Sequence, residues 1–267
     1  MLLVMGLGAQ LIHWHEEFCL AMASGGFHVI RYDNRDVGLS TRTEGPRPDV
    51  LAAFGGDTSQ ATYTLVDMAA DAAALLDVLS IDAGHVVGVS MGGMIAQQLA
   101  IHHPDRVLSL CSIMSTPTGD MSSDPATSEA GALLFGPPAK TREEAVNASV
   151  ASSRVIGSTA FEIDEELIRE RAGQAYDRAF YPLGVARQLC AIIASGDWRP
   201  ALAKLELPTV VIHGGVDPLV RPSWGRATAD AIPGAELVII EGMGHDLPRG
   251  AWDTVVGAIL GNAGKAA

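Results

Sequence analysis

The chain has 267 residues, of which 48% are hydrophobic and 18% are charged, and its formal net charge at pH 7 is −13. This composition suits one large domain, or a domain that carries an insertion, and it excludes a chain that is disordered throughout. A surface this acidic repels phosphate groups, so nucleic acid and anionic membranes are excluded as expected partners.

Three cysteines occur and none belongs to a Cys-x-x-Cys pair, which fits free thiols in a reducing compartment. The opening MLLVM has no basic segment and no cleavage site, so it is expected to be a strand and not a signal peptide. No apolar run approaches the ~18–20 residues that span a bilayer. Together these features predict a cytoplasmic protein.

Six short apolar runs alternate with helical patterns along the chain. They are rich in Val, Ile and Leu, and most of them lack alternating polar residues, which is typical of strands buried on both faces of a parallel sheet. In chain order, the runs cover residues 2–5, 28–32, 85–89, 107–114, 209–213 and 236–240. Residues 65–79 have the apolar spacing of a helix, and residues 91–101 are expected to form another. The predicted class is α/β, with a mostly parallel sheet flanked by helices.

The alternation stops in the middle of the chain. A Ser/Thr/Pro-rich stretch at 115–125 follows the fourth run, and residues 142–157 and 164–195 then favour helices with no strand between them. A helical segment of about 80 residues is too short to bury much core of its own. We therefore expect a helical cap at residues 118–205, inserted after the strand at 107–114 into an α/β core of residues 1–117 and 206–267.

Residues 88–92 read Gly-Val-Ser-Met-Gly, between a predicted buried strand and a predicted helix. In this context the Gly-x-Ser-x-Gly motif predicts a nucleophile elbow that holds Ser90 in a strained turn. Gly88 and Gly92 would lack side chains where the strand and the helix come closest. The alternatives are a serine that only caps the helix and a phosphate-binding loop, and the second lacks the lysine that its motif requires.

A serine hydroxyl is a weak nucleophile, so it needs a base and a group that orients this base. With this elbow, an acid follows a later strand and a histidine comes near the end of the chain. Asp217 follows the fifth apolar run and His245 follows the sixth, so both should reach the same sheet edge as Ser90. We expect His245 to be the base and Asp217 to orient it. Asp217 could also be a plain Asp-Pro turn residue, and Asp246 and Asp120 are the spare acids.

A glycine pair, Gly6 and Gly8, follows the first apolar run. A dinucleotide-binding loop would need a third glycine where Leu11 stands. We instead expect this loop to help form an oxyanion hole, in which main-chain amides stabilise the oxygen that becomes negative during acyl transfer. The expected donors are the amides of Leu7 and Met91, and the alternative is an ordinary glycine turn.

Five segments together resemble the α/β-hydrolase superfamily over nearly the whole chain: MGLG, YDNRDVGLS, HVVGVSMGG, GGVDPLV and GMGHDLP. Asp36 replaces the glycine that is commoner in this loop, which makes the chain most similar to the aclacinomycin methyl esterase-like group of esterases and lactonases. The resemblance implies hydrolysis of a carboxylic ester or lactone without a cofactor, with Ser90, Asp217 and His245 as the catalytic set. Members carry an antiparallel hairpin before the first strand seen here, so we expect a smaller sheet or a missing upstream segment.

Within YDNRDVGLS, a structural role is expected for the charged residues. Asp33 or Asp36 would pair with Arg35 and lock the loop, and Gly38 would supply a turn.

Several aromatic and histidine residues are candidates for the substrate pocket. His13 and Trp14 follow the first glycine loop, and Phe135 and Tyr181 fall in the predicted cap, whose underside would face the substrate. No metal site is expected, because Cys19 stands where a His-Glu-x-x-His motif needs its second histidine.

The expected activity is hydrolysis of a small to medium, fairly apolar carboxylic ester through a serine acyl-enzyme. The expected partner is accordingly a small-molecule ester or lactone. An N-acyl-homoserine lactonase with the same triad is the main alternative. A perhydrolase or haloperoxidase, and a ligand-binding protein without catalysis on the same scaffold, are further alternatives.

Overall fold

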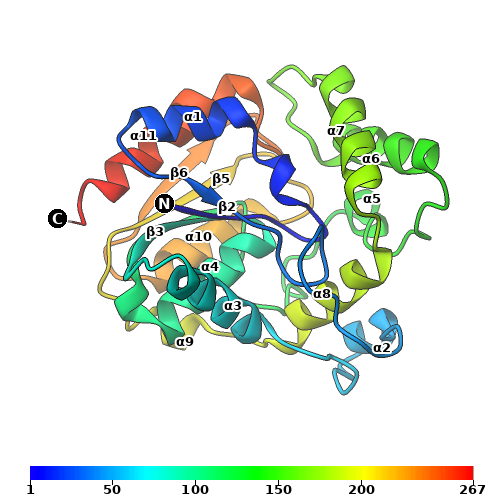
Figure 1. The fold of residues 1–267 in the computed structure, drawn as a ribbon, viewed down its shortest axis with the longest axis horizontal. Coiled ribbons are helices and arrows are strands. Elements are labelled where there is room, and N and C mark those ends of the chain that lie inside the picture. Colours follow the sequence, from blue (N-terminus) through cyan, green and yellow to red (C-terminus); the bar gives the residue numbers. More distant parts are fainter. Residues whose placement is uncertain (267) are drawn as a thin grey trace.

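The computed structural model describes residues 1–266, and a six-stranded parallel sheet lies at its centre (Figure 1). The strands are β1 (Leu2–Val4), β2 (Ile30–Arg31), β3 (Gly84–Val89), β4 (Val107–Ile113), β5 (Thr209–Gly214) and β6 (Glu236–Ile240). They are ordered β2-β1-β3-β4-β5-β6, and every pairing between them is parallel. All six apolar runs contain a strand, which confirms the predicted fold class.

The order in which strands are added to the sheet changes side at β1. β2 lies on one side of β1, whereas β3 and all later strands lie on the other side. Val4, at the end of β1, is in register with Gly88 near the end of β3. The loops that follow these two strands therefore start next to each other, at the edge where parallel α/β sheets bind their ligands.

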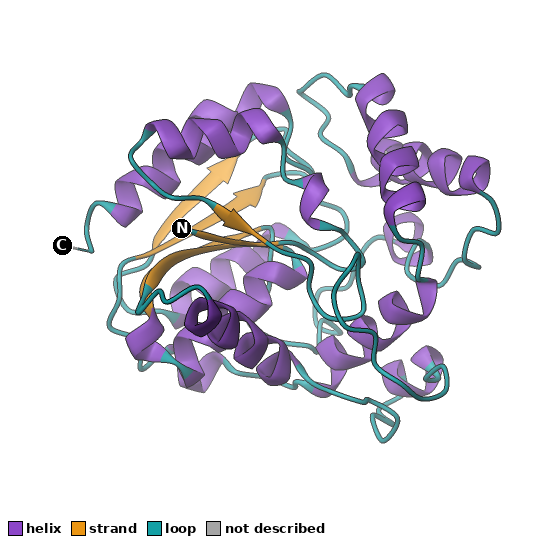
Figure 2. Cartoon of the chain, viewed as in Figure 1, coloured by secondary structure: helices purple, strands orange, loops and turns teal. Residues whose placement is uncertain are grey.

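Helices cover both faces of the sheet (Figures 1 and 2). One face is covered by α1 (Glu16–Ser24) and α11 (Trp252–Ala263), and the other by α3 (Leu65–Val78), α4 (Met91–His102), α9 (Arg199–Leu202) and α10 (Pro222–Ala231). Because successive strand residues point to opposite faces, Leu2 and Val4 pack with α3 and α4, and Leu3 and Met5 pack with α1 and α11. The strands are apolar on both sides for this reason.

The helix predicted at 65–79 forms as α3, one residue shorter. Thr64 and Asp67 form a capping box at its start, in which the Thr64 amide donates to the Asp67 carboxylate at 2.8 Å. Leu65, Met68 and Leu76 are buried at helical spacing on the face turned to the sheet. Burial of that face, rather than local propensity, holds the helix in place.

Between β4 and β5 the chain forms helices in place of strands. They are α5 (Ser128–Ala132), α6 (Arg142–Ile156), α7 (Glu165–Arg178), α8 (Pro182–Ala194) and α9. The helical stretch predicted at 164–195 is interrupted before Pro182, because proline favours the first turn of a new helix. α6 and α7 lie side by side at one end of the molecule (Figure 1). By contrast, Leu189, Ala191 and Ile192 of α8 belong to the same core as α3 and α4.

Short helical segments complete the fold. They are α2 (Val50–Phe54) and the 3-10 helices Leu11–His13, Pro104–Arg106 and Arg249–Ala251. Within residues 1–266, no helix combines the length and the apolar character that crossing a lipid bilayer requires.

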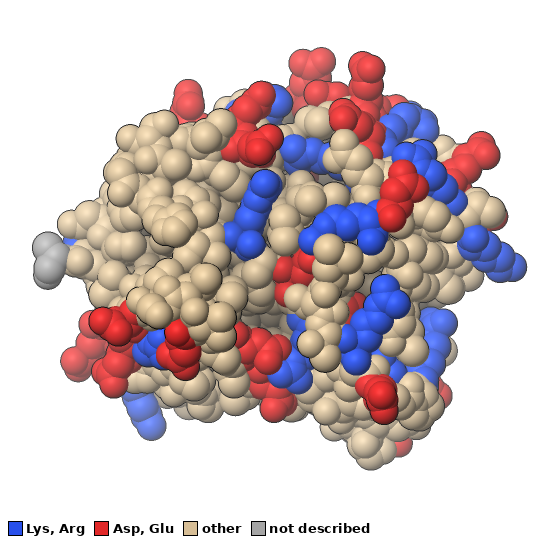
Figure 3. Space-filling view, in the orientation of Figure 1, with Lys and Arg blue, Asp and Glu red and all other residues tan. Residues whose placement is uncertain are grey.

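The charged side chains are unevenly distributed, although the net charge is −13. On the face drawn in Figure 3, most Lys and Arg side chains gather over the half of the molecule that carries α6, α7 and α8. Acidic side chains lie mainly along the upper edge and at the lower left of the same view. Arg178 of α7 and the buried Arg187 of α8 instead pair with aspartates of the loop after β2.

Candidate active site

Ser90 stands on a sharp turn between β3 and α4. Its φ of 56° and ψ of −122° lie in a region that residues other than glycine rarely adopt. A Cβ on Gly88 would come within 2.0 Å of the Gly92 carbonyl oxygen, and one on Gly92 within 2.1 Å of the Val4 carbonyl oxygen. The two glycines are therefore required because the backbones of the turn, of α4 and of β1 approach too closely for side chains.

The serine does not act as a helix cap, because its side chain forms no capping hydrogen bond with α4. Hydrogen bonds of the Ser90 main-chain groups hold the turn instead. The Ser90 amide donates to the Ile113 carbonyl at 2.8 Å, and the Ser90 carbonyl accepts from Ser115 Oγ at 2.8 Å. The Ser90 hydroxyl group thus remains available to another partner.

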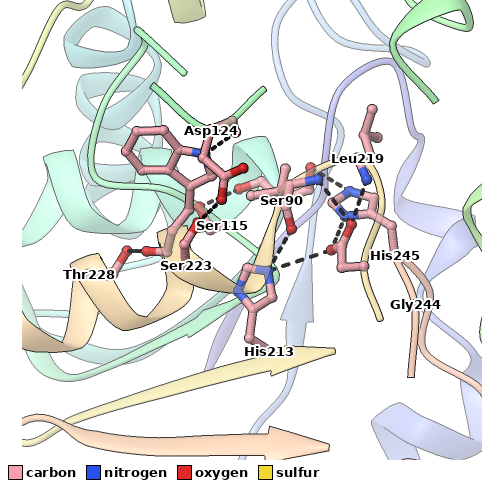
Figure 4. A network of polar contacts seen from close by, with 12 residues as sticks. Ser90, Ser115, Asp124, His213, Leu219, Ser223, Thr228, Gly244 and His245 are labelled. Carbon is pink, nitrogen blue, oxygen red and sulfur yellow. Dashed lines mark hydrogen bonds and ion pairs between the residues drawn. The ribbon is translucent and has the colours of Figure 1, made fainter. Parts of the chain in front are cut away.

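That partner is His245, in the loop after β6. Its Nε2 lies 3.0 Å from Ser90 Oγ, and its Nδ1 lies 2.7 Å from Oδ2 of Asp217 (Figure 4). Asp217 is fully buried, and its Oδ1 accepts from the amides of Leu219 and Val220, each at 2.9 Å. Because the carboxylate can only accept, Nδ1 carries the proton and Nε2 accepts from the Ser90 hydroxyl.

The two spare acids are engaged elsewhere. Asp246 accepts from Ser158 Oγ at 2.5 Å, and Asp120 accepts from the Ser122 amide at 2.9 Å. Burial raises the pKa of the Asp246 carboxyl, and its hydrogen bond with Ser158 opposes this rise. Of the three acids considered from the sequence, Asp217 is the one that contacts His245.

A second histidine lies behind Asp217, and the sequence analysis missed it. His213, at the end of β5, is fully buried, and its Nε2 donates to the Val220 carbonyl at 2.8 Å and lies 3.6 Å from Asp217 Oδ2. Burial lowers its pKa, so the imidazole stays neutral beside the carboxylate. Among residues 1–266, His213 Nδ1 has no hydrogen-bond partner. The only signal in the sequence is a polar residue in an apolar strand four positions before Asp217.

The loop that carries His245 is tied to the end of α6 and to the segment that follows it. The His245 amide donates to the Ile156 carbonyl at 2.6 Å, and the Gly244 amide donates to Ser158 Oγ at 3.1 Å. The Thr159 amide donates to the Gly242 carbonyl at 2.8 Å. The inserted helices therefore share a border with the loop of the candidate base.

The loop after β1 packs directly against Ser90. A Cβ on Gly6 would come within 3.2 Å of Ser90 Cβ and 3.7 Å of Ser90 Oγ. Met91 is the first residue of α4, so its amide is one of the N-terminal N–H groups that have no carbonyl in the preceding turn. Leu7 directly follows Gly6. The two expected oxyanion donors thus belong to chain segments that meet at Ser90, and their role stays a prediction.

A cavity of about 200 Å³ lies between this loop and the inserted helices. Its wall consists of Gly8, Gln10, His13, Asp36, Val37, Gly38, Ala145, Ser149, Ala172, Ala175, Tyr176, Ala179, Phe180, Tyr181, Pro182 and Val185. His13 and Tyr181 belong to this wall, whereas Ser90, Asp217 and His245 do not, so a place for His13 and Tyr181 in a substrate pocket stays a prediction. Trp14 does not belong to the wall, because it is buried in the core and stacked on Phe18 at 5.8 Å. Phe135 does not either, since it packs on Phe54 at 5.0 Å and is 45% exposed.

The histidines near the first loop bond to protein groups. The Gln10 amide donates to His13 Nδ1 at 3.0 Å, and Arg171 Nη2 lies 2.7 Å from His15 Nδ1. Burial lowers the pKa of His13, and burial together with Arg171 and Arg249 lowers the pKa of His15 to about 4. Both imidazoles are therefore neutral near pH 7.

The ion pairs of the loop after β2 differ from those expected. The observed pairs are Arg35–Asp71 at 2.5 Å, Arg178–Asp33 at 2.7 Å and Arg187–Asp36 at 3.6 Å. Arg35 therefore turns to α3, and arginines of α7 and α8 take its place beside the two aspartates. Gly38 does supply a turn, with φ at 59°, and a Cβ there would come within 2.2 Å of the Asp33 carboxylate. The loop is structural, as predicted, but long-range contacts lock it.

Comparisons with known proteins agree with this architecture. Residues 1–248 match the model of the α/β-hydrolase fold family. A rhodomycin D methylesterase from Streptomyces sp. (strain C5) is 30% identical over 97% of this chain and 89% of its own length. The crystal structure of an enol-lactonase from Burkholderia xenovorans LB400 has a TM-score of 0.73 at 25% identity, covering 98% of this chain and 89% of that one.

A third similar protein is Est816, whose structure is described as that of an N-acyl homoserine lactone degrading enzyme. It has a TM-score of 0.67 at 26% identity, covering 91% of this chain and 85% of that one. The match of the family model to nearly the whole chain, together with the parallel sheet and the serine elbow at its edge, identifies the chain as a member of the α/β-hydrolase fold family.

Proposed function

We propose that the chain is a carboxylic ester hydrolase in which Ser90 attacks the ester carbonyl. The observation that carries the proposal is the hydrogen-bonded series Asp217–His245–Ser90, with steps of 2.7 and 3.0 Å. It leaves His245 Nε2 ready to accept the hydroxyl proton. The names of the similar proteins, a methylesterase and an enol-lactonase, agree with this reaction class.

The reaction begins with acylation of the serine. Ser90 Oγ forms a bond to the carbonyl carbon while its proton passes to His245 Nε2, and the carbonyl π electrons move onto the carbonyl oxygen. When the tetrahedral intermediate collapses, the bond from carbon to the alcohol oxygen breaks. The alcohol leaves with the proton that His245 returns, and the acyl group stays on Ser90.

Deacylation repeats these steps with water. A water molecule gives a proton to His245 and attacks the acyl carbon, and the bond to Ser90 Oγ breaks as Oγ regains its proton. The products are the alcohol and a carboxylic acid, and the enzyme is unchanged. In both halves we assign the amides of Leu7 and Met91 to the negative oxygen, where a single donor of this kind contributes about 3–4 kcal/mol.

The substrate we propose is a small to medium, uncharged and fairly apolar ester. Most of the cavity wall is alanine, valine, proline and aromatic residues, and His13 is neutral. Arg178 and Arg187, which lie near this wall, are already paired with aspartates. We propose that the substrate reaches from Ser90 into this cavity, whose wall favours apolar groups over charged ones. We include His13 and Tyr181 among the residues that contact the substrate.

The inserted helices are proposed to form a cap at residues 118–205 over a core of residues 1–117 and 206–267. The partner is proposed to be a small-molecule ester or lactone, and neither nucleic acid nor a membrane. We further propose a cytoplasmic location, which the free thiols of Cys19, Cys111 and Cys190 support.

The decisive experiment combines a substitution with a covalent label. Ser90→Ala should lower kcat for p-nitrophenyl acetate by about 10⁶-fold, because the nucleophile is lost. A fluorophosphonate probe should label the wild type and not the variant. Turnover by Ser90→Ala near the wild-type rate would refute the mechanism, and a wild type that neither turns over nor labels would refute the proposed function.

A lactonase is the second candidate, and the similarity to Est816 and to the enol-lactonase favours it. The same serine chemistry opens a lactone, in which the leaving alcohol remains attached to the acyl group. A pH-stat titration with N-acyl-homoserine lactones of rising chain length, run beside p-nitrophenyl esters, separates the two. A kcat/KM at least tenfold higher for a lactone than for any ester would favour the lactonase.

A further inference from the structure

A buried glutamine on α8 joins the inserted helices to the loop beside Ser90. Gln188 is 0% exposed, and its Oε1 accepts from the Gly8 amide at 2.8 Å. Its Nε2 donates to the Arg35 carbonyl at 2.8 Å. One side chain thus links the loops that follow β1 and β2, about 180 and 150 residues away in the chain. No local pattern in the sequence reveals this link.

The contact with Gly8 fixes the peptide next to Leu7. The Gly6 carbonyl accepts from the Ala9 amide at 3.2 Å, which holds the peptide plane that contains the Leu7 N–H. Gln188 holds the following plane through the Gly8 N–H. With the peptide planes on both sides of the Leu7 Cα restrained, the Leu7 amide has little freedom to turn, and the hydrogen bond to the Gly6 carbonyl also makes that amide a stronger donor.

α8 itself has little freedom to move away from the loops. A Cβ on Gly184 would come within 1.9 Å of the Asp36 carbonyl oxygen, so the helix meets the loop after β2 backbone to backbone. Val185 packs on Gly8, which has φ at 67°. Arg187 is buried and donates to the Thr43 and Gly45 carbonyls. Gln188 therefore projects from a rigid support.

We propose that Gln188 is a positioning residue that aims the Leu7 amide at the oxyanion of the transition state. This inference rests on the proposed function, because it needs an acyl-transfer reaction at Ser90. The negative charge develops fully only in the transition state, so a misaimed donor lowers kcat more than it changes KM. Complete loss of one oxyanion donor lowers kcat by about 10²–10³-fold. Loss of the restraint on the Leu7 amide, with the donor itself still present, should lower kcat by about 10–100-fold.

The test is Gln188→Met, which keeps the length of the side chain and removes both hydrogen bonds. Gln97→Met is the matched control, because Gln97 is also 0% exposed and bonds to Ser112 and Trp198 inside the core. Both variants should lose similar thermal stability. Gln188→Met should lower kcat for p-nitrophenyl acetate at least tenfold with KM within about threefold, and Gln97→Met should keep kcat within about twofold. Binding of a phenylboronic acid, which forms a tetrahedral adduct on serine, should weaken in parallel with kcat/KM for Gln188→Met alone.

Equal loss of kcat in the two variants, or an unchanged kcat in Gln188→Met, would overturn the proposal. Hydrogen–deuterium exchange of the wild type provides a reading that does not depend on how the variants fold. The Gly8 amide should exchange slowly, and fast exchange would also overturn the proposal. If the wild type shows no ester hydrolysis and no fluorophosphonate labelling, the proposed function fails. Slow exchange of the Gly8 amide would still support its hydrogen bond with Gln188.

Discussion

Asp217→Asn tests how His245 is oriented more sharply than removal of the whole Asp217 side chain would. The Asp217 carboxylate accepts three hydrogen bonds: Oδ2 from His245 Nδ1 at 2.7 Å, and Oδ1 from the amides of Leu219 and Val220 at 2.9 Å. An asparagine can keep its oxygen toward the two amides, which then turns its NH₂ group toward His245. This NH₂ donates, so it requires an unprotonated Nδ1 and moves the imidazole proton to Nε2.

The expected loss follows from this change of tautomer. With a proton on Nε2, His245 cannot accept the Ser90 proton, and kcat should fall by about 10⁴-fold, which corresponds to about 5.4 kcal/mol of transition-state stabilisation. The free energy of unfolding should change by less than about 2 kcal/mol, because the two amide bonds and the shape of the side chain are kept. Stopped-flow or steady-state hydrolysis of p-nitrophenyl acetate measures the first quantity, and urea denaturation measures the second.

Asp246→Asn is the matched control, because Asp246 is the neighbouring acid and its carboxylate bonds to Ser158. It should keep kcat within about tenfold. A variant Asp217→Asn that retained a tenth or more of the wild-type kcat would refute the assignment of Asp217. So would a larger loss in Asp246→Asn than in Asp217→Asn.

Two further predictions concern stability. Gly92→Ala should lower the free energy of unfolding by about 3 kcal/mol or more, because its Cβ would come within 2.1 Å of a main-chain carbonyl. The control is Gly261→Ala, in an open position of α11, which should raise the free energy of unfolding by about 0.5–1 kcal/mol. Equal effects of the two substitutions in urea denaturation would contradict the packing argument. The second prediction is that the free energy of unfolding falls as the pH drops from about 6.5 to about 4. The pKa values of His15 and His213 are lowered in the folded chain, so the folded chain binds fewer protons than the unfolded chain in this pH range. Urea midpoints measured across this range should decline less in His15→Gln, and a flat profile in the wild type would count against buried neutral histidines.

Local patterns in the sequence were sufficient to predict the parallel sheet and the turn at Ser90. Apolar runs without alternation predicted parallel strands, because both faces of the sheet are covered and most strand residues pack on one side or the other. Gly88 and Gly92 predicted a close approach of backbones, since glycine is the residue that such an approach requires. The order of Ser90, Asp217 and His245, each after a strand, predicted that they would share one edge.

Partners distant in the chain depended on how the helices pack, which no local pattern contains. Trp14 could have faced a pocket or the core, and the packing of α1 on the sheet places it in the core beside Phe18. Arg35 is only two residues from Asp33 along the chain, yet the cation that contacts that carboxylate is Arg178, at the end of α7.

The amino-acid sequence by itself determined the class of fold and the position of the serine elbow, since both depend on periodicity and on backbone sterics over a few residues. The tertiary structure decided which side chains support them, including Gln188 on Gly8 and His213 behind Asp217. A hydrogen bond needs its atoms within about 3 Å of each other, and between segments 150 residues apart the relative placement of packed helices and strands sets that distance.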